Sequence, residues 1–547
     1  MKKLFSVCVL FLAVTLVGCT KDSGSGSTEP SSDLTLAMPA DVVSLDPHGT
    51  NDTPSEQVRH MIYEGLVKQD EDLNLAPSLA TEWEQVDELT WHFKLKEGVK
   101  FHDGTEFTAE DVKASFDRIL DPAVASPREY LLEMIDEIKI INDYEIEITT
   151  SYPFSPFANN LTHGAGRIIS KDLIDKDYQN AIDKSGEEIT LEEYYEKREK
   201  GGKEFEDIAA KLGGEIGSLL EKEPAGTNYF KFDSRNPGEL TKLVLNEEYH
   251  GGAIKIDSVT FKVVSETGAR IAELESDQSQ FAGSLQSSDR DRIKSNSELV
   301  MSETPSASLA YIGFNTKVEP LDDKRVRQAL AYAFDKEKIF NDVLNGSGTI
   351  TNNYIKDGMV GYTDDLKKYD YNLDKAKELL EEAGYGDGFK IEFLSDDDIE
   401  VKDVGLYYQE ILKELNIDLT IKQVEWGTFL EMASNGEQDM YYLGWSNATA
   451  DPDNTFTPLF HTDSQGAGGN RMFYSDKKVD ELILQGRQET DPEKRELIYK
   501  DIQDIIIEDM PMIPIRFSDK LNAYSTKLKD ARIDVNDLLH LDKAYIE

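Results

Sequence analysis

Cysteine is nearly absent from this chain of 547 residues, which contains only Cys8 and Cys19. Cys8 lies in an apolar N-terminal run that indicates a signal peptide, so the mature protein would keep Cys19 alone. An internal disulfide is then excluded. A secreted domain without disulfides must rely on a large hydrophobic core, and this chain is long enough to build one.

Positive charge is also scarce. The chain has 59 Lys and Arg against 106 Asp and Glu, a formal net charge of −47, and no basic stretch stands out. Phosphate binding needs clustered basic side chains, so we expect no nucleic-acid partner. The acidity fits a protein that stays soluble outside the cell.

Catalytic and metal-binding motifs are missing. The chain has no His-Glu-x-x-His motif, no phosphate-binding glycine loop ending in Lys-Ser or Lys-Thr, and no Gly-x-Ser-x-Gly elbow. Its eight histidines are scattered, and none forms the i, i+4 pair of a helical metal site. We therefore expect no enzyme, no metal and no cofactor.

Long apolar runs are limited to Leu4–Val17, about 14 residues and too short to span a bilayer. The run follows Lys2 and Lys3 and ends in Leu-Val-Gly-Cys19, which resembles a bacterial lipobox, where a peptidase cuts before the cysteine and a lipid is attached. The alternative is an ordinary signal peptide cut elsewhere. The small polar residues up to Asp33 indicate a flexible tether, so only the lipid on Cys19 is expected to touch the membrane, on its extracytoplasmic face.

Strand and helix patterns alternate along the remainder, which predicts an α/β fold. Residues 89–95 have apolar side chains at every second position, as in a half-buried strand. Thr108, with Asp111 three residues later, predicts a helix start. Gly384 predicts the end of another helix. Residues 171–222 are dense in Glu, Lys and Asp and predict short helices with a solvated face; a docking surface for another protein is the alternative.

Five blocks of sequence occur in an order typical of one family. They are LDPHGTNDTPSEQVRHMIYEGLV, LAPSLATEWEQVDELTWHFKLKEGVKFHDGTEFTAEDVKASFDRI, YIGFNTKVEPLDDKRVRQALAYAFDKEKI, DKAKELLEEAGY and DMYYLGWSNATADPDNTFTPLFHT. The chain resembles family 5 of the extracellular solute-binding proteins, which serve ABC importers of peptides, nickel and glutathione. The first and last blocks, with GNRMFYS, are most similar to the glutathione- and dipeptide-binding branch.

The resemblance implies a two-lobed fold of the periplasmic-binding-protein (Venus flytrap) type, with mixed sheets, two hinge strands and an extra subdomain in the first lobe. The implied division is signal peptide 1–18, lipidated cysteine and tether 19–33, lobe 1 at 34–65, 165–305 and 512–547, its subdomain at 66–164, and lobe 2 at 306–511. The hinge crossings are expected at 306–315 and 511–518. Relatives commonly have Gly-Thr-Gly-Pro-Tyr where this chain has Gly226 to Phe230, and the acidic insert exceeds their usual length.

The resemblance also implies a function. The protein would be a monomeric receptor that captures a short peptide or a glutathione-like peptide and delivers it to an importer of two permease and two ATPase subunits. A receptor of the same fold for nickel chelates or another non-peptide solute is one alternative. A surface enzyme or chaperone on the same scaffold is the other.

The charged residues that bind the ends of the ligand are expected in the second lobe. In peptide-binding relatives an acidic residue three positions after the tryptophan of the Gly-Trp block meets the ligand's α-amino group; here Trp445 is followed at that distance by Ala448. A ligand with a different end, such as the γ-glutamyl end of glutathione, fits this change. Asp451 would replace the missing acid, and Arg471 would bind a ligand carboxylate. Alternatively, these two pair with each other or with local backbone.

Three further residues are candidates for the ligand cleft. Trp445 and Trp426 are expected to form its walls, because an aromatic ring gives apolar contact at small entropic cost; core packing is the alternative. Asn315 is expected either to bond a ligand amide or to cap a turn.

Replacement of Cys19 by Ala tests the lipobox. The variant should appear in the growth medium, because the lipid is the expected link to the membrane, and fractionation followed by immunoblotting measures this. A variant that stays as firmly membrane-bound as the parent would contradict lipidation at Cys19.

Overall fold

One mixed sheet of 11 strands runs through the structure, a computed structural model that describes residues 32–70 and 74–547. The signal peptide, Cys19 and most of the tether lie outside the described residues. The strand order is β15 (Asp418–Gln423), β14 (Lys390–Ser395), β16 (Met440–Ser446), β12 (Leu299–Phe314), β17 (Met512–Ser525), β11 (Phe281–Ala282), β1 (Asp33–Met38), β10 (Ser258–Val263), β9 (Leu240–Leu245) and β8 (Phe230–Asn236), with β13 (Thr349–Ile350) against β17.

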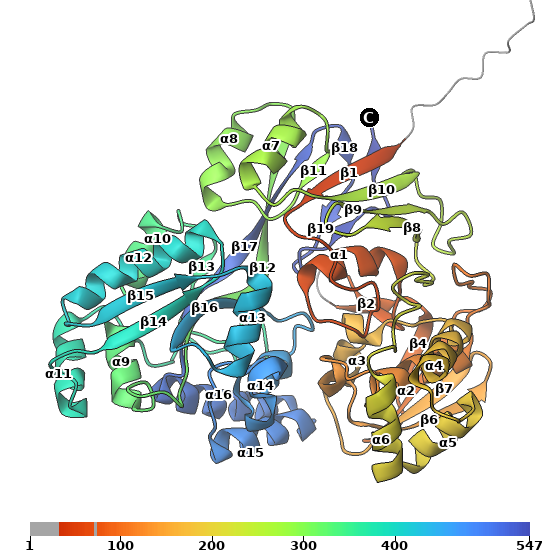
Figure 1. The fold of residues 1–547 in the computed structure, drawn as a ribbon, viewed down its shortest axis with the longest axis horizontal. Coiled ribbons are helices and arrows are strands. Elements are labelled where there is room, and N and C mark those ends of the chain that lie inside the picture. Colours follow the sequence, from red (N-terminus) through yellow and green to blue (C-terminus); the bar gives the residue numbers. More distant parts are fainter. Residues whose placement is uncertain (1–31, 71–73) are drawn as a thin grey trace, which may run out of the picture. The chain divides into compact units, whose positions relative to one another are not determined.

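Strands β12 and β17 connect the two halves of this sheet (Figure 1). They pair antiparallel from Leu299 opposite Ser525 to Gly313 opposite Met512. The register shifts between Pro305 and Leu309, where β12 carries extra residues relative to β17. Of the predicted crossings, residues 306–314 lie in β12 and residues 512–518 in β17. A bulge of this kind bends the strand locally.

We call the predicted range 306–511 lobe 2. Its core consists of buried apolar residues from Leu309 to Met510, together with the first part of β17 up to Phe517. Its amphipathic helices bury their apolar stripes against the strands. They are α9 (Lys324–Tyr332), α10 (Lys336–Asp342), α11 (Leu373–Ala383), α12 (Ile399–Lys413), α13 (Trp426–Asn435), α14 (Asp453–Phe460), α15 (Lys477–Gln488) and α16 (Pro492–Asp509).

The remaining described residues, which we call lobe 1, have separate cores. One lies within 66–168, around the four-stranded sheet β4 (Ala80–Gln85), β5 (Thr90–Leu95), β7 (Glu145–Thr150) and β6 (Ile135–Asn142). Other elements of lobe 1 are α1 (Thr53–Ile62), α2 (Ala109–Ile119), α3 (Phe157–Asn160), α7 (Thr267–Glu275), α8 (Arg290–Lys294), β2 (Val67–Gln69), β3 (Leu75–Pro77), β18 (Leu528–Lys529), β19 (Arg532–Ile533), β20 (Leu539–His540) and β21 (Tyr545–Ile546).

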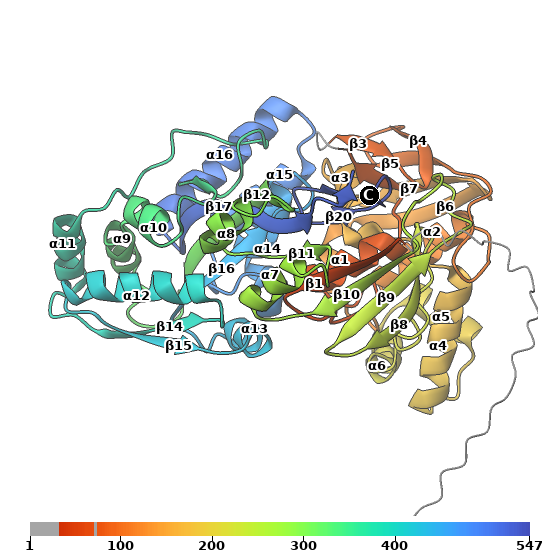
Figure 2. The same cartoon turned by 90° about the horizontal axis from the view of Figure 1, so that it is seen from above.

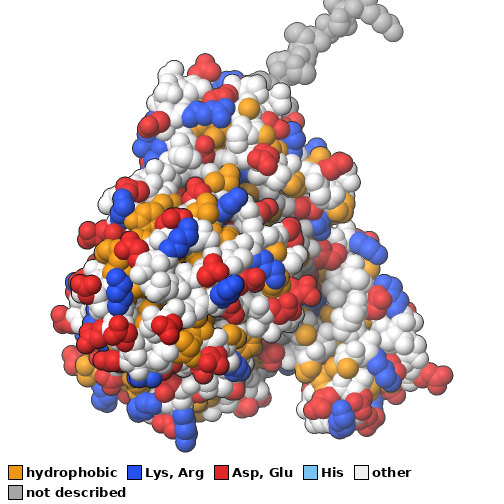
Figure 3. Space-filling view, turned by 60° about the vertical axis from the view of Figure 1, so that its left-hand side comes forward, with side chains coloured by type: hydrophobic (Ala, Val, Ile, Leu, Met, Phe, Trp, Pro, Cys, Tyr) orange, Lys and Arg blue, Asp and Glu red, His pale blue; other side chains and the backbone are white. Residues whose placement is uncertain are grey.

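The acidic insert forms three helices, α4 (Lys171–Ser185), α5 (Leu191–Lys200) and α6 (Lys203–Leu212), grouped at one end of lobe 1 (Figures 1 and 2). Its apolar side chains, including those of Tyr178 and Phe205, join a second core of lobe 1, which also contains Leu34 of β1 and Val58 of α1. On the molecular face drawn in Figure 3, Lys and Arg lie scattered among Asp and Glu. The insert is therefore an integral part of lobe 1, with a charged outer side.

Two local predictions are confirmed. Helix α2 begins directly after Thr108, whose backbone N–H donates to the Asp111 carboxylate at 2.8 Å. Helix α11 ends at Ala383, and Gly384 follows in the left-handed region with φ 88°. Within the described ranges, no helix combines the length and apolar character needed to cross a bilayer.

Two buried histidines in lobe 1 lie among basic groups. Burial, with Arg118 close by, lowers the pKa of His48 to about 3. Burial, with His540 close by, lowers the pKa of His60 to about 4. Both side chains are almost inaccessible, at 0% and 4% exposure, so each is held neutral in the fold.

Stability should therefore fall as the solution is acidified. A histidine titrates near 6.5 in the unfolded chain, so its stabilising contribution is complete above that pH and is lost as the pH falls towards the folded pKa. Each such histidine costs about 1.4 kcal/mol of unfolding free energy per pH unit below 6.5. Urea denaturation at pH 7, 6 and 5 measures this. A free energy of unfolding that stays constant over this range would contradict the assignment.

Candidate functional site

Strand β16 has one partly unpaired edge. It pairs with β12 along its whole length, from Met440 to Ser446. On its other side it pairs with β14 only at Met440 and Tyr441. Among the described residues, the backbone from Tyr442 to Ser446 has no strand partner on that side, and Gly444 and Ser446 are exposed. Such an edge offers a row of free N–H and C=O groups to another extended chain.

Trp445 lies on this open segment and is tied to the start of α14. Its indole N–H donates to the backbone carbonyl of Asn454 at 2.7 Å. The Asn454 side-chain oxygen accepts from the backbone N–H of Ala448 at 2.9 Å, and its amide donates to the Tyr130 hydroxyl of lobe 1 at 3.1 Å. Asn454 therefore links the tryptophan, the turn after β16 and the opposite lobe.

Asp451 is close to this group in the chain, but its carboxylate is already bound. Arg495 donates to both oxygens, at 2.7 and 2.8 Å, and the carboxylate is buried, with the residue 5% exposed. The expectation that Asp451 faces a ligand ammonium is therefore not supported by this arrangement, because a bidentate pair leaves little accepting capacity for another cation. The contacts favour a role in holding the loop.

Asn315 lies at the far end of β12 from this segment. Its amide donates to the carbonyls of Gly436 at 3.1 Å and Gln438 at 3.0 Å, and its oxygen accepts from the N–H of Lys317 at 3.1 Å. The side chain is 2% exposed. Of the two expectations for Asn315, these contacts favour the turn cap, because each polar group is occupied within the protein.

Arg471 does not pair with Asp451. Its Nε donates to the Ser434 hydroxyl at 3.3 Å, and in the described part of the chain no carboxylate forms an ion pair with it. Burial raises the pKa of the neighbouring Tyr311 to about 12, and the positive charge of Arg471 opposes that rise. Tyr441, also beside it, is four residues before Trp445 on β16, roughly 13 Å along a strand.

Trp426 is the first residue of α13 and is 40% exposed. Its ring stacks on Phe429, with centroids 5.7 Å apart and planes 7° from parallel. The contacts of Asn454 thus connect Trp445 with the segment that contains Asp451. The contacts described for Trp426, Arg471 and Asn315 are with other residues of lobe 2.

Sequence reasoning missed Tyr130 and Asn454. Asn454 lies in the quoted segment ATADPDN, but nothing in its local pattern marks it as a contact between lobes. Tyr130 is 324 residues from it in the chain. Only the folded structure brings these side chains together.

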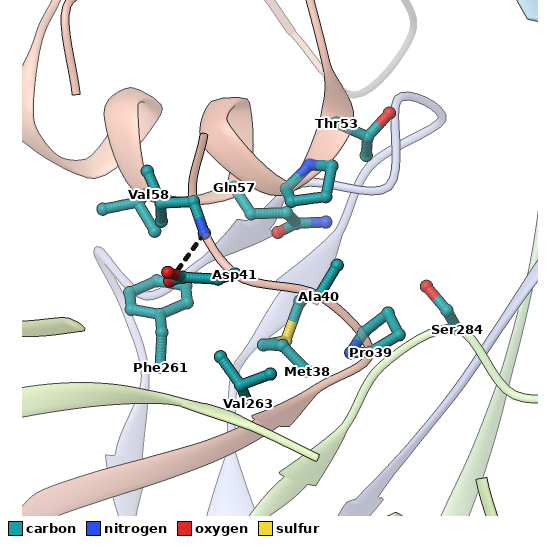
Figure 4. A pocket seen from close by; sticks show the side chains of 12 residues that line it. Met38, Pro39, Ala40, Asp41, Thr53, Gln57, Val58, Phe261, Val263 and Ser284 are labelled. Atoms are coloured by element: carbon teal, nitrogen blue, oxygen red, sulfur yellow. Dashed lines mark hydrogen bonds between the residues drawn. The ribbon is translucent and has the colours of Figure 1, made fainter. Parts of the chain in front are cut away.

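A separate pocket of about 80 Å³ lies in lobe 1, between the ends of β1 and β10 and the start of α1 (Figure 4). Met38, Phe261 and Val263 line its floor, and the Asp41 carboxylate accepts from the N–H of Val42 at 2.8 Å. Ligand pockets usually measure roughly 300 to 1,000 Å³. This pocket is too small for a peptide and contains none of the predicted site residues.

A match to a known family explains this architecture. The family model of the bacterial extracellular solute-binding proteins, family 5 (middle), matches residues 74–467. The chain belongs to this family.

Relatives and solved structures agree with the family membership. The glutathione-binding protein GsiB of Escherichia coli K12 is 30% identical over 505 residues, which cover 91% of each chain. The DppA protein of Helicobacter pylori, solved with the peptide STSA, has a TM-score of 0.81 at 26% identity and covers 94% of this chain and 98% of its own. The AppA protein of Bacillus subtilis, solved with a nonapeptide, has a TM-score of 0.80 at 26% identity, with coverage of 95% and 100%.

The predicted resemblance to family 5, and within it to the glutathione- and dipeptide-binding branch, is confirmed by these relatives. The predicted two-lobed mixed α/β fold is confirmed by the solved structures. The family is described by its binding of solutes. Among residues 32–70 and 74–547, no group of three or more His, Cys, Asp or Glu side chains is placed to hold a metal ion.

Replacement of Asp451 by Asn distinguishes a structural role from a ligand role in this member of family 5. The variant should lower the unfolding free energy of the unliganded protein by about 3 to 5 kcal/mol, because it leaves Arg495 buried without its partner. Urea denaturation measures the loss. Asp463→Asn is the control, since the Asp463 side chain is 92% exposed. Equal stability of the two variants would argue against a structural Asp451.

Proposed function

We propose that this protein captures a short peptide, or a glutathione-like peptide, whose backbone lies along the open edge of β16. The unpaired segment from Tyr442 to Ser446 is the observation that carries the proposal. An extended peptide adds to such an edge through main-chain hydrogen bonds, which explains tolerance for many side chains. Peptides in the solved DppA and AppA structures, and the name of GsiB, support this ligand class.

The glycine on this edge fits the proposal. A side chain built at Gly444 would make only ordinary contacts with its own fold, the nearest atom being the Ser308 hydroxyl oxygen at 3.6 Å. Glycine is therefore not required there by packing. Its small size leaves room for another backbone to approach β16 closely.

The residues available to contact the ends of the ligand narrow its chemical class. Position 448 carries no acid, the N–H of Ala448 is bound by Asn454, and the Asp451 carboxylate is bound by Arg495. A ligand whose end is not an ordinary α-ammonium, such as a γ-glutamyl group, suits this environment. We propose Trp445 and Trp426 as ring contacts for the ligand. Arg471, which has no carboxylate partner among the described residues, stays a candidate for the ligand carboxylate.

The proposal includes anchoring and delivery. A lipid on Cys19, which lies outside the described residues, would hold a monomeric receptor near an importer of two permease and two ATPase subunits. Confinement near the membrane raises the effective concentration of the receptor at the permease. The extracellular location of the family is consistent with this arrangement.

Thermal unfolding with a ligand panel tests the proposed class. Di- to pentapeptides, reduced glutathione and oxidised glutathione should include members that raise the melting temperature, because a ligand at about 100 times its Kd stabilises the folded state by roughly 2.7 kcal/mol. No shift across this panel, together with a shift from a nickel–histidine chelate, would contradict peptide binding and favour the non-peptide alternative.

Gly444→Val provides the matched variant for this experiment. It should weaken binding of the active ligand at least about tenfold, because a side chain would obstruct the approach to β16, while the unliganded melting temperature stays near that of the parent. Gly268→Val in lobe 1, where no atom lies within 4 Å of an added side chain, is the control. Undiminished affinity in Gly444→Val would remove the open edge from the binding site.

A further inference from the structure

The two lobes also meet at the end of α15, away from β12 and β17. Helix α15 of lobe 2 ends at Gln488, and the last carbonyls of a helix lack partners within the helix. Ser155 of lobe 1 donates hydrogen bonds to two carbonyls at this helix end. Its backbone N–H donates to the Arg487 carbonyl at 3.2 Å, and its hydroxyl donates to the Glu489 carbonyl at 2.8 Å. The end of α15 is therefore capped from the opposite lobe.

Arg487 adds charge to the same contact. Its guanidinium donates to the Glu133 carboxylate of lobe 1 at 2.8 Å and to the Tyr130 carbonyl at 3.2 Å. It also lies 5.1 Å from the centre of the Phe154 ring. The Arg487 side chain is 4% exposed, whereas that of Glu133 is 45% exposed. Residues of lobe 1 thus help to bury the Arg487 guanidinium.

Asp453 keeps this arginine paired whether or not lobe 1 is present. Its carboxylate belongs to lobe 2, is 2% exposed and lies 3.4 Å from the Arg487 Nε. A buried charge left without a partner costs several kcal/mol. Because Asp453 belongs to the same lobe as Arg487, separation of the lobes exchanges the contacts of Arg487 with Glu133, the Tyr130 carbonyl and the Phe154 ring for water but leaves its buried carboxylate partner in place. Such a contact can be made and broken repeatedly at small cost.

The contact is also joined to the proposed binding edge. Asn454, next to Asp453, donates to the Tyr130 hydroxyl and accepts from Ala448 N–H, while its carbonyl holds the Trp445 indole. Tyr130 itself provides the carbonyl for Arg487. A movement of lobe 1 would therefore change the contacts of Asn454, which holds the Trp445 indole, and of Arg487 beside the neighbouring Asp453.

We propose that Ser155, Glu133 and Tyr130 of lobe 1 and Arg487, Glu489 and Asn454 of lobe 2 form a latch that holds the lobes closed over the ligand and limits its escape. This inference rests on the proposed function, in that a ligand lies at the β16 edge. It concerns how long the bound state lasts rather than which ligand is chosen.

Three variants test the latch: Glu133→Gln, Ser155→Ala and the double variant. The control is Glu137→Gln, because Glu137 is exposed on the same lobe and forms no ion pair within 4.0 Å in the described structure. Residues 32–547 contain no cysteine. Spin labels at Glu84→Cys and Lys477→Cys, in a chain with Cys8 and Cys19 replaced by Ser, report the distance between lobes by pulsed electron paramagnetic resonance. Both label positions are exposed.

We expect the double variant to move the label distances, without ligand, towards longer values. It should also speed dissociation of the ligand found active in the thermal panel by about two- to fivefold, the size expected for partly exposed polar contacts. Glu137→Gln should change neither quantity. Distances and dissociation rates equal to those of Glu137→Gln would overturn the latch, as would a lowered melting temperature without a change in distance.

The two proposals fail in distinguishable ways. If no ligand of the panel binds, the proposed function fails, yet the label distances still test the latch. If ligands bind and dissociate from the double variant at the parental rate, the latch fails and the proposed function stands.

Discussion

The antiparallel pairing of β12 with β17 is the interaction on which the rest of the structure depends. These strands are 16 and 14 residues long and pair from Leu299 to Gly313. Their ladder joins the strands of lobe 1 to those of lobe 2 in one sheet. Separation of the lobes would break that ladder, whereas bending at the irregularity between Pro305 and Leu309 preserves most of it. Hinge closure about such a pair is a known mode of motion in binding proteins.

The candidate site follows from the offset between the strands beside this pair. Strand β14 ends at Ser395, but β16 continues along β12 to Ser446, where the Ser446 hydroxyl donates to that of Ser308 at 3.1 Å. The two strands are offset, with Phe393 and Leu394 near the end of β14 opposite Met440 and Tyr441 at the start of β16, so the edge from Tyr442 to Ser446 is unpaired on one side. Because Ser308 lies within the irregular part of β12, the open edge begins beside the hinge. A ligand bound at that edge would therefore lie next to the part of β12 that bends when the lobes move.

Buried arginines explain why carboxylates near the site are difficult to assign from the sequence. Arg118, Arg495 and Arg487 are buried and lie against Asp46, Asp451 and Asp453. A buried cation needs a partner, since breaking such a pair leaves an uncompensated charge. In the sequence, Asp451 is one of 106 acidic residues, and its partner Arg495 is 44 residues away. The resemblance led us to expect that its carboxylate would meet a ligand ammonium, whereas in the structure Arg495 donates to both carboxylate oxygens.

Local and ordered features of the sequence determined much of this protein. The helix start at Thr108, the helix end at Gly384, the alternating strands and the order of the five blocks depend on residues close together in the chain, and they were enough to predict the family and the fold. The contact of Trp445 with a ligand stays a prediction. Only the tertiary structure decided which polar groups meet. Asn454 and Tyr130 are 324 residues apart, and Arg487 and Glu133 are 354 apart. Their contacts depend on how the two lobes pack, which no spacing along the chain encodes.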